Sequence, residues 1–157
     1  MNLNLRKFLA IAFLAAAAGT SHACRAEGPP EFRTSNLQIA GADGGRHAFT
    51  VEIADSEALR QRGLMFRKSL PADHGMLLLY DKPRPVAIWM KDTPLALDIL
   101  FINERNRIVS IAADAMPMSL TIMSSMVPVR AVLEIAAGQA KKQGIRVGDS
   151  VVFPDGD

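Results

Sequence analysis

Short apolar runs separated by turn-forming segments make up most of the chain beyond its first thirty or so residues. Residues 36–40 and 47–53 are two such runs, and the Gly-rich segment 41–45 between them predicts a hairpin. The run 99–102 is apolar throughout, which is typical of a strand covered on both faces. Further strands are expected at residues 76–80, 86–91, 98–102, 108–112, 130–136 and 145–153.

One clear helix is expected, between Asp55 and Gly63. Asp55 is placed to cap its first turn, and Gly63 supplies the left-handed residue that commonly ends a helix. Residues 138–143 add at most a single helical turn. About eight short strands with one short helix predict a mainly β single domain, a β-sandwich or a small barrel, over residues 35–154.

The N-terminus has the order of a secretory signal peptide. Arg6 and Lys7 precede an uninterrupted apolar run at residues 8–18, and small residues follow at Ser21 and Ala23. The run is shorter than the roughly 20 apolar residues that span a bilayer. We therefore expect residues 1–23 to be removed and the mature protein to be exported to the periplasm.

Cys24 is the only cysteine in the chain. Cleavage after Ala23 would leave it at the new N-terminus, where bacterial lipoproteins carry their lipid. Ser21 stands where such sites usually have Leu, so ordinary cleavage near Ala23 or Ala26 remains the alternative. Contact with a membrane is expected only through such a lipid, and residues 24–34 have the composition of a tether.

The charge balance argues against several classes of partner. The chain has 18 Lys and Arg against 16 Asp and Glu, a net charge of +2, and loss of residues 1–23 removes Arg6 and Lys7 but no acid. A mature chain without net charge is not expected to bind nucleic acid. Because no phosphate loop, zinc-binding helix motif or Ser/His/Asp arrangement is present, we expect no cofactor.

Four short sequences follow one another in the centre of the chain: GLM at 63–65, GML at 75–77, WMK at 89–91 and LD at 97–98. With LE at 133–134, Gly138, and GD at 148–149, they resemble the family called domain of unknown function 192, over residues 48–153. The resemblance implies a mainly β, frequently exported domain with no established catalytic residues. Asp92 stands where the family usually has Asn, so if that position forms a hydrogen bond specific to an amide, this protein makes it differently.

Trp89 and Lys91 alternate with Met90, so on a strand they share one face. At a cleft, such a pair would form a stacking platform for a sugar or an aromatic ligand. We favour the alternative in which Trp89 belongs to the core and Lys91 reaches water at its rim. The candidate ligand-binding residues are Trp89, Lys91, Asp92, Asp98 and Glu134.

Asp98 and Glu134 both lie on apolar strands. Such acids are either paired structurally or used as an acid–base pair. We favour the structural role, because an unpaired buried carboxylate is costly. Its expected partners are backbone amides and the bases Arg62, Arg67 and Lys91. A hydrolase that uses Asp98 and Glu134 is the alternative.

A methionine-rich segment supplies a second alternative, since thioethers select Cu(I). The segment contains no His or Cys, and Met is also a common filler of irregular cores. Its methionines are Met116, Met118, Met123 and Met126. The leading hypothesis is an exported, non-catalytic binding or accessory module of the cell envelope, whose partner is a glycan or another envelope component.

Overall fold

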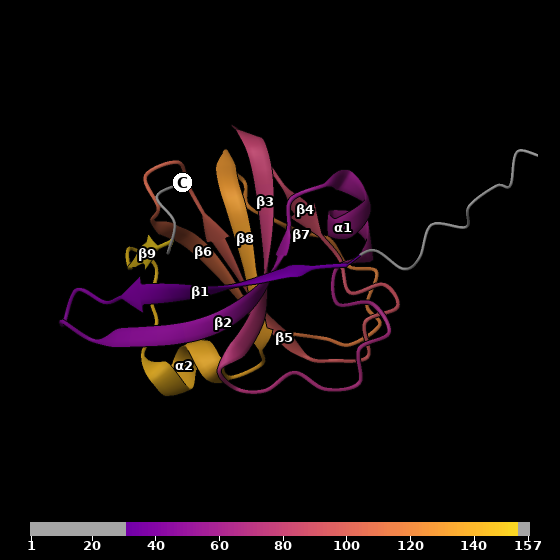
Figure 1. The fold of residues 1–157 in the computed structure, drawn as a ribbon, viewed down its shortest axis with the longest axis horizontal. Coiled ribbons are helices and arrows are strands. Elements are labelled where there is room, and N and C mark those ends of the chain that lie inside the picture. Colours follow the sequence, from indigo (N-terminus) through magenta and orange to yellow (C-terminus); the bar gives the residue numbers. More distant parts are fainter. Residues whose placement is uncertain (1–30, 154–157) are drawn as a thin grey trace, which may run out of the picture.

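The computed structural model describes residues 31–153, so the predicted signal peptide and Cys24 lie outside the described residues. A seven-stranded sheet dominates this part of the chain, with the strand order β6-β5-β8-β3-β2-β1-β9 (Figure 1). Its strands are β1 (Arg33–Ala40), β2 (Arg46–Ala54), β3 (His74–Arg84), β5 (Leu97–Ile102), β6 (Ile108–Ala115), β8 (Val129–Ala136) and β9 (Ser150–Val152). The remaining elements are the strand pair β4 (Ala87–Ile88) and β7 (Met123–Ser124), and the helices α1 (Glu57–Arg62) and α2 (Gln139–Gln143).

All paired strands of the large sheet are antiparallel except β2 and β3. These two strands are parallel, and α1 lies between them along the chain. The sheet curls so that β9 returns to the residues in front of β6, where Arg107 bridges Ser150. Two backbone hydrogen bonds strengthen this seam, from Ile108 N to Asp149 O (3.0 Å) and from Val151 N to Asn106 O (2.7 Å). The expected mainly β single domain, a β-sandwich or small barrel, is confirmed, and the sheet is curled into a half-barrel.

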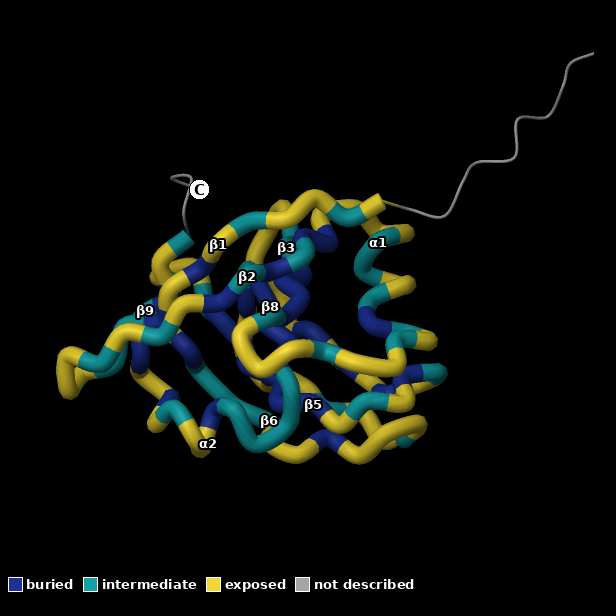
Figure 2. The backbone as a smooth tube through the Cα atoms, turned by 60° about the horizontal axis from the view of Figure 1, so that its bottom comes forward, coloured by how far each residue is buried: buried dark blue, intermediate teal, exposed yellow. Residues whose placement is uncertain are grey.

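The curled sheet buries apolar side chains on both faces, because residues along each strand alternate in direction. The inner core receives residues from all seven strands and from α2, among them Leu37, Phe49 and Leu133. The outer core lies beneath α1 and β4 and includes Met76 and Ile99. Figure 2 shows this buried interior, with the exposed turns at its ends. Every residue of β5 is buried, as expected for a strand covered on both faces.

The predicted hairpin is confirmed, because β1 and β2 pair throughout their length. The end of α1 at Gly63 is also confirmed: its φ is 45°, and its N–H donates to Leu59 O. The N-cap prediction was wrong. Ser56 Oγ, rather than Asp55, accepts from Leu59 N at 3.2 Å, while Asp55 pairs with Arg33.

Several predicted boundaries differ from the structure. The first strand begins two residues inside the predicted tether 24–34, because its N-terminal half pairs with the end of β2. Of the predicted strand 86–91, only β4 pairs as a strand, with the equally short β7, which the sequence did not indicate. The predicted strand 145–153 is extended only at β9, after the turn at residues 148–149. Within residues 31–153, no helix is long and apolar enough to cross a bilayer.

Candidate functional site

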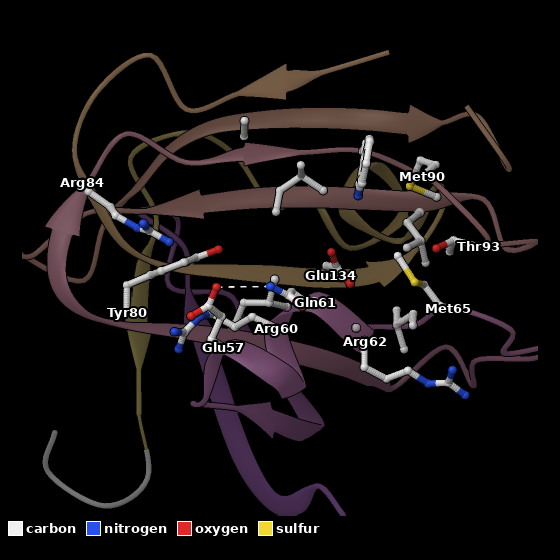
Figure 3. A pocket seen from close by; sticks show the side chains of 17 residues that line it. Glu57, Arg60, Gln61, Arg62, Met65, Tyr80, Arg84, Met90, Thr93 and Glu134 are labelled. Atoms are coloured by element: carbon white, nitrogen blue, oxygen red, sulfur yellow. Dashed lines mark hydrogen bonds between the residues drawn. The ribbon is translucent and has the colours of Figure 1, made fainter. Parts of the chain in front are cut away.

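A cleft of about 280 Å³ opens on the outer face of the curled sheet, between α1 and β4 (Figure 3). Its walls come from α1, from the Gly63–Met65 turn and from the segment 87–90, and its floor comes from β3, β5 and β8. Leu64, Leu78, Met90 and Leu97 form the apolar part of the lining. The polar and aromatic residues that line it are Glu57, Arg60, Gln61, Arg62, Tyr80, Arg84, Trp89, Thr93 and Glu134.

Helix α1 presents one face to the cleft, because Glu57, Arg60 and Gln61 are spaced as i, i+3 and i+4. Arg60 ties the helix to the neighbouring strand. Its Nη1 atom donates to Asp55 O at 2.8 Å and to Leu79 O at 2.7 Å. These bonds hold one wall of the cleft against β3, although α1 itself has no fully buried residue.

Glu134 supplies the carboxyl group in the cleft. On β8 it alternates with inner-core residues, so its side chain joins the outer face between Met76 of β3 and Ile99 of β5, its partners in the two strand registers. Glu134 is only 6% exposed, and within residues 31–153 its carboxyl group has no hydrogen bond or ion pair. Burial raises its pKa to about 7. The predicted pairing of Glu134 with Arg62, Arg67 or Lys91 was therefore wrong.

Tyr80 lies at one end of the cleft between two guanidinium groups (Figure 3). The Cζ atoms of Arg60 and Arg84 are 5.1 Å and 4.9 Å from the centre of its ring. Burial raises the pKa of Tyr80; the two arginines oppose this rise, and the charge of Glu134 adds to it. Two cations on one aromatic ring thus concentrate positive charge at this end of the cleft.

Trp89 is 49% exposed, so the core position that we favoured was wrong. The segment does alternate as expected, but Ile88 and Met90 occupy the buried face and turn Trp89 outward. There it lines the cleft, with Lys91 Nζ 5.7 Å from the centre of its ring. Trp89 is thus accessible at the cleft rather than part of the core.

Asp98 points away from the cleft. It neighbours Glu134 across the sheet, but it faces the inner side, opposite Ile135. Two residues of β6 oppose Asp98 at a bulge, and Asp98 Oδ1 accepts from Asp114 N there, at 2.9 Å. Its Oδ2 accepts from Ala140 N of α2, also at 2.9 Å, which gives that helix the cap its own N-cap Gly138 cannot provide.

Asp98 is therefore a structural acceptor, although its partners are amides rather than the bases considered above. Because Asp98 and Glu134 lie on opposite faces of the sheet, the two acids cannot act on one substrate. The hydrolase hypothesis built on this pair was wrong.

Asp92 and Lys91 lie beside the cleft but do not line it. The φ of Asp92 is 52°, its carbonyl accepts from Phe66 N at 2.7 Å, and its Oδ2 is 3.8 Å from Lys91 Nζ. Within residues 31–153, its carboxylate forms no hydrogen bond that the amide of an Asn at this position would replace. The position requires a left-handed backbone, which both Asn and Asp tolerate.

The Cu(I) hypothesis receives no support. Met116, Met118 and Met126 are 72%, 56% and 83% exposed, whereas Met123 packs against the outer core. Among residues 31–153, no group of three or more His, Cys, Asp or Glu side chains could hold a metal ion.

Sequence reasoning identified Trp89 and Glu134 but missed most of the cleft. The i, i+3, i+4 spacing of Glu57, Arg60 and Gln61 would have indicated one polar helix face. Tyr80 and Arg84 carry no comparable signal, because they meet α1 only through the parallel pairing of β2 with β3.

Two solved structures resemble the whole domain. A crystal structure from Sinorhizobium meliloti 1021, described as a candidate transcription regulator, has a TM-score of 0.78 and 39% identity, and the match covers 80% of this chain and 98% of that one. A protein of unknown function from Novosphingobium aromaticivorans DSM 12444 has a TM-score of 0.76 and 36% identity, with 86% and 99% covered. No protein of curated function matches the sequence. The profile of domain of unknown function 192, described as "Uncharacterized ACR", matches residues 38–153, and the chain belongs to this family.

Proposed function

We propose that this protein is an exported, non-catalytic binding module of the cell envelope, and that its ligand occupies the cleft between α1 and β4. One observation carries the proposal. Glu134 is a nearly buried residue whose carboxyl group opens into the cleft and has no partner within residues 31–153. A buried polar group without a partner is costly unless a ligand or water satisfies it.

The surroundings of Glu134 suit binding better than hydrolysis. Trp89 offers a half-exposed indole at the cleft, which is typical of residues that anchor ligands. Of the two acids Asp98 and Glu134, only Glu134 lines the cleft, because Asp98 is engaged with two backbone amides on the other face. Glu57, the other acid of the lining, instead accepts from Gln61 at the rim.

Transcription regulation, the description attached to the Sinorhizobium protein, is not proposed for this chain. DNA-binding domains concentrate positive charge, whereas this chain has 18 bases against 16 acids. An envelope glycan is the partner that agrees best with the predicted signal peptide and with an aromatic residue at the cleft.

The proposal is tested by sedimentation with purified cell-wall sacculi. We expect the protein to pellet with the sacculi, and we expect Trp89→Ala to remain in the supernatant. Val147→Ala is the matched control, because it also removes an exposed apolar side chain but lies outside the cleft. A parent protein that does not pellet, or a Trp89→Ala variant that pellets like the parent, would overturn the proposal.

Export is tested separately by the mass of the native protein from fractionated cells. The expected result is a periplasmic or membrane-anchored chain that lacks residues 1–23. An added diacylglyceryl mass on Cys24 would establish the lipid, and a chain that retains Met1 would refute export.

A further inference from the structure

We infer that the cleft selects a sugar-sized ligand that carries a single anionic group. Its anion meets the guanidinium pair around Tyr80, and its hydroxyl groups meet Glu134. This inference rests on the proposed function, because it names the ligand class of the same site.

The anion-binding end is built from Arg60 and Arg84. The Cζ atoms of both side chains lie over the Tyr80 ring, 5.1 Å and 4.9 Å from its centre, so two positive charges border this end of the cleft. Within residues 31–153 neither forms an ion pair, and Arg60 uses only Nη1 for its two backbone bonds. Donors therefore remain for a carboxylate or phosphate, which guanidinium groups bind well.

The excess of positive charge extends along the cleft. Arg62 also lines it and likewise has no ion pair within residues 31–153, and Glu57 is the acid at the rim. Three bases outnumber the two acids of the lining, Glu57 at the rim and the partly protonated Glu134, so the cleft repels a cationic ligand and attracts an anion. Figure 3 shows Arg84 and Arg60 toward the Tyr80 end and Arg62 toward the end with Met65.

Glu134 gives the middle of the cleft a different chemistry. A ligand acid whose body is apolar would cover the Glu134 carboxyl group without giving it a hydrogen bond, which is unfavourable. Because burial raises the pKa of Glu134 to about 7, a large share of the group is protonated at neutral pH. A protonated carboxyl group both donates and accepts, and hydroxyl groups do the same.

The size and the aromatic lining agree with one sugar ring. A volume of about 280 Å³ is near the lower end of the roughly 300–1,000 Å³ typical of small-molecule sites. Trp89 is the only tryptophan in the chain and it lines the cleft, so its fluorescence reports occupancy of this site directly.

Four probes of similar size separate the required features. Glucuronate carries hydroxyl groups and an anion, glucose only the hydroxyl groups, cyclohexanecarboxylate only the anion, and glucosamine a cation. Titrations followed by Trp89 fluorescence should give the tightest binding for glucuronate, about tenfold tighter than for glucose. Cyclohexanecarboxylate should bind more weakly than glucuronate, and glucosamine most weakly of the four.

Variants then assign each feature to its residue. Arg84→Gln should lower the affinity for glucuronate until it is close to the affinity for glucose. Arg105→Gln, the same change at an exposed residue outside the cleft, should leave both affinities unchanged. Glu134→Leu should weaken the binding of glucuronate and leave the binding of cyclohexanecarboxylate unchanged or tighter. Circular dichroism checks that each variant is folded, and Glu134→Gln, which keeps hydrogen bonding, should retain most of the glucuronate affinity.

The outcomes separate this inference from the proposed function. Equal binding of glucose and glucuronate, or preference for glucosamine, refutes the anionic class even if sacculi still bind through Trp89. No fluorescence response to any probe, together with Trp89-dependent pelleting on sacculi, likewise refutes the inference and leaves the proposed function standing. Glucuronate binding that is lost in Arg84→Gln supports the inference even where sacculi do not pellet the protein.

Discussion

The carboxyl group of Glu134 should make the stability of the protein fall as the pH rises from about 4.5 to about 7. Its pKa is 4.5 in an unfolded chain and about 7 in the folded protein, because burial disfavours the charged form. Between these values the folded state binds more protons than the unfolded state. Its free energy of unfolding therefore decreases with increasing pH and levels off above about 7.

The size of this decrease follows from the two pKa values. Each pKa unit between folded and unfolded states corresponds to about 1.4 kcal/mol. Ionising Glu134 inside the folded protein therefore costs about 3 kcal/mol, present at pH 8 and absent at pH 4. Glu134→Gln keeps the shape of the side chain but cannot ionise, so this variant should lack the decrease.

Urea denaturation of the parent and of Glu134→Gln, measured from pH 4 to pH 8, tests the reasoning. Other acids titrate in both proteins, so the difference between the two curves isolates Glu134. We expect the variant to gain stability relative to the parent by about 3 kcal/mol between the two extremes. Curves that differ by a constant offset would show that Glu134 ionises normally in the folded protein, and would refute the description of its environment.

Three further predictions concern the backbone around the site. Asp98→Ala should lower the melting temperature more than Asp98→Asn, since each unpaired amide costs about 1–3 kcal/mol and Asn keeps one acceptor; equal losses would contradict the two bonds. Gly75→Ala should lower the free energy of unfolding by about 1–3 kcal/mol, because the new Cβ would lie 2.6 Å from Glu134 O. Gly41→Ala is the control, because its new Cβ meets only the flexible end of Asp43. Similar urea unfolding midpoints for the two variants would argue against the close approach at Gly75. Asp92→Asn should melt at or above the melting temperature of the parent, whereas Asp92→Ala should be about 1 kcal/mol less stable than the parent, because the φ of residue 92 is 52°. An Asn variant that is less stable than the parent would count against the explanation from backbone conformation.

Two short apolar runs with a Gly-rich turn between them were enough to predict the hairpin of β1 and β2, and a continuous apolar run was enough to predict the buried β5. The weakness of such patterns was where strands are short. Residues 86–91 alternate like a strand, yet only Ala87 and Ile88 pair, because their partner β7 is a two-residue strand. Periodicity records which side chains are buried, and it contains no information on which backbone lies alongside.

The candidate site shows the same limit. Trp89 and Glu134 could be singled out because their residue types are unusual on an apolar strand. Whether Glu134 had a partner depended on the order of β3, β8 and β5, which places Met76 and Ile99 beside it. Neither neighbour is close to Glu134 in the sequence. The pairing of Arg60 with Arg84 around Tyr80 similarly depends on a parallel crossover that local patterns do not reveal.

The seam at β9 has a consequence for the order in which the protein can fold. β9 pairs with β1 at the opposite end of the described chain, and the segment just before it and its first residues bond to Ile108 and Asn106. Contacts between residues so distant in sequence slow folding. During synthesis the edge of β1 therefore stays unpaired until the last strand has emerged. Unpaired edges invite association between chains, so a nascent or truncated chain that ends before Ser150 should aggregate more readily than one that includes β9.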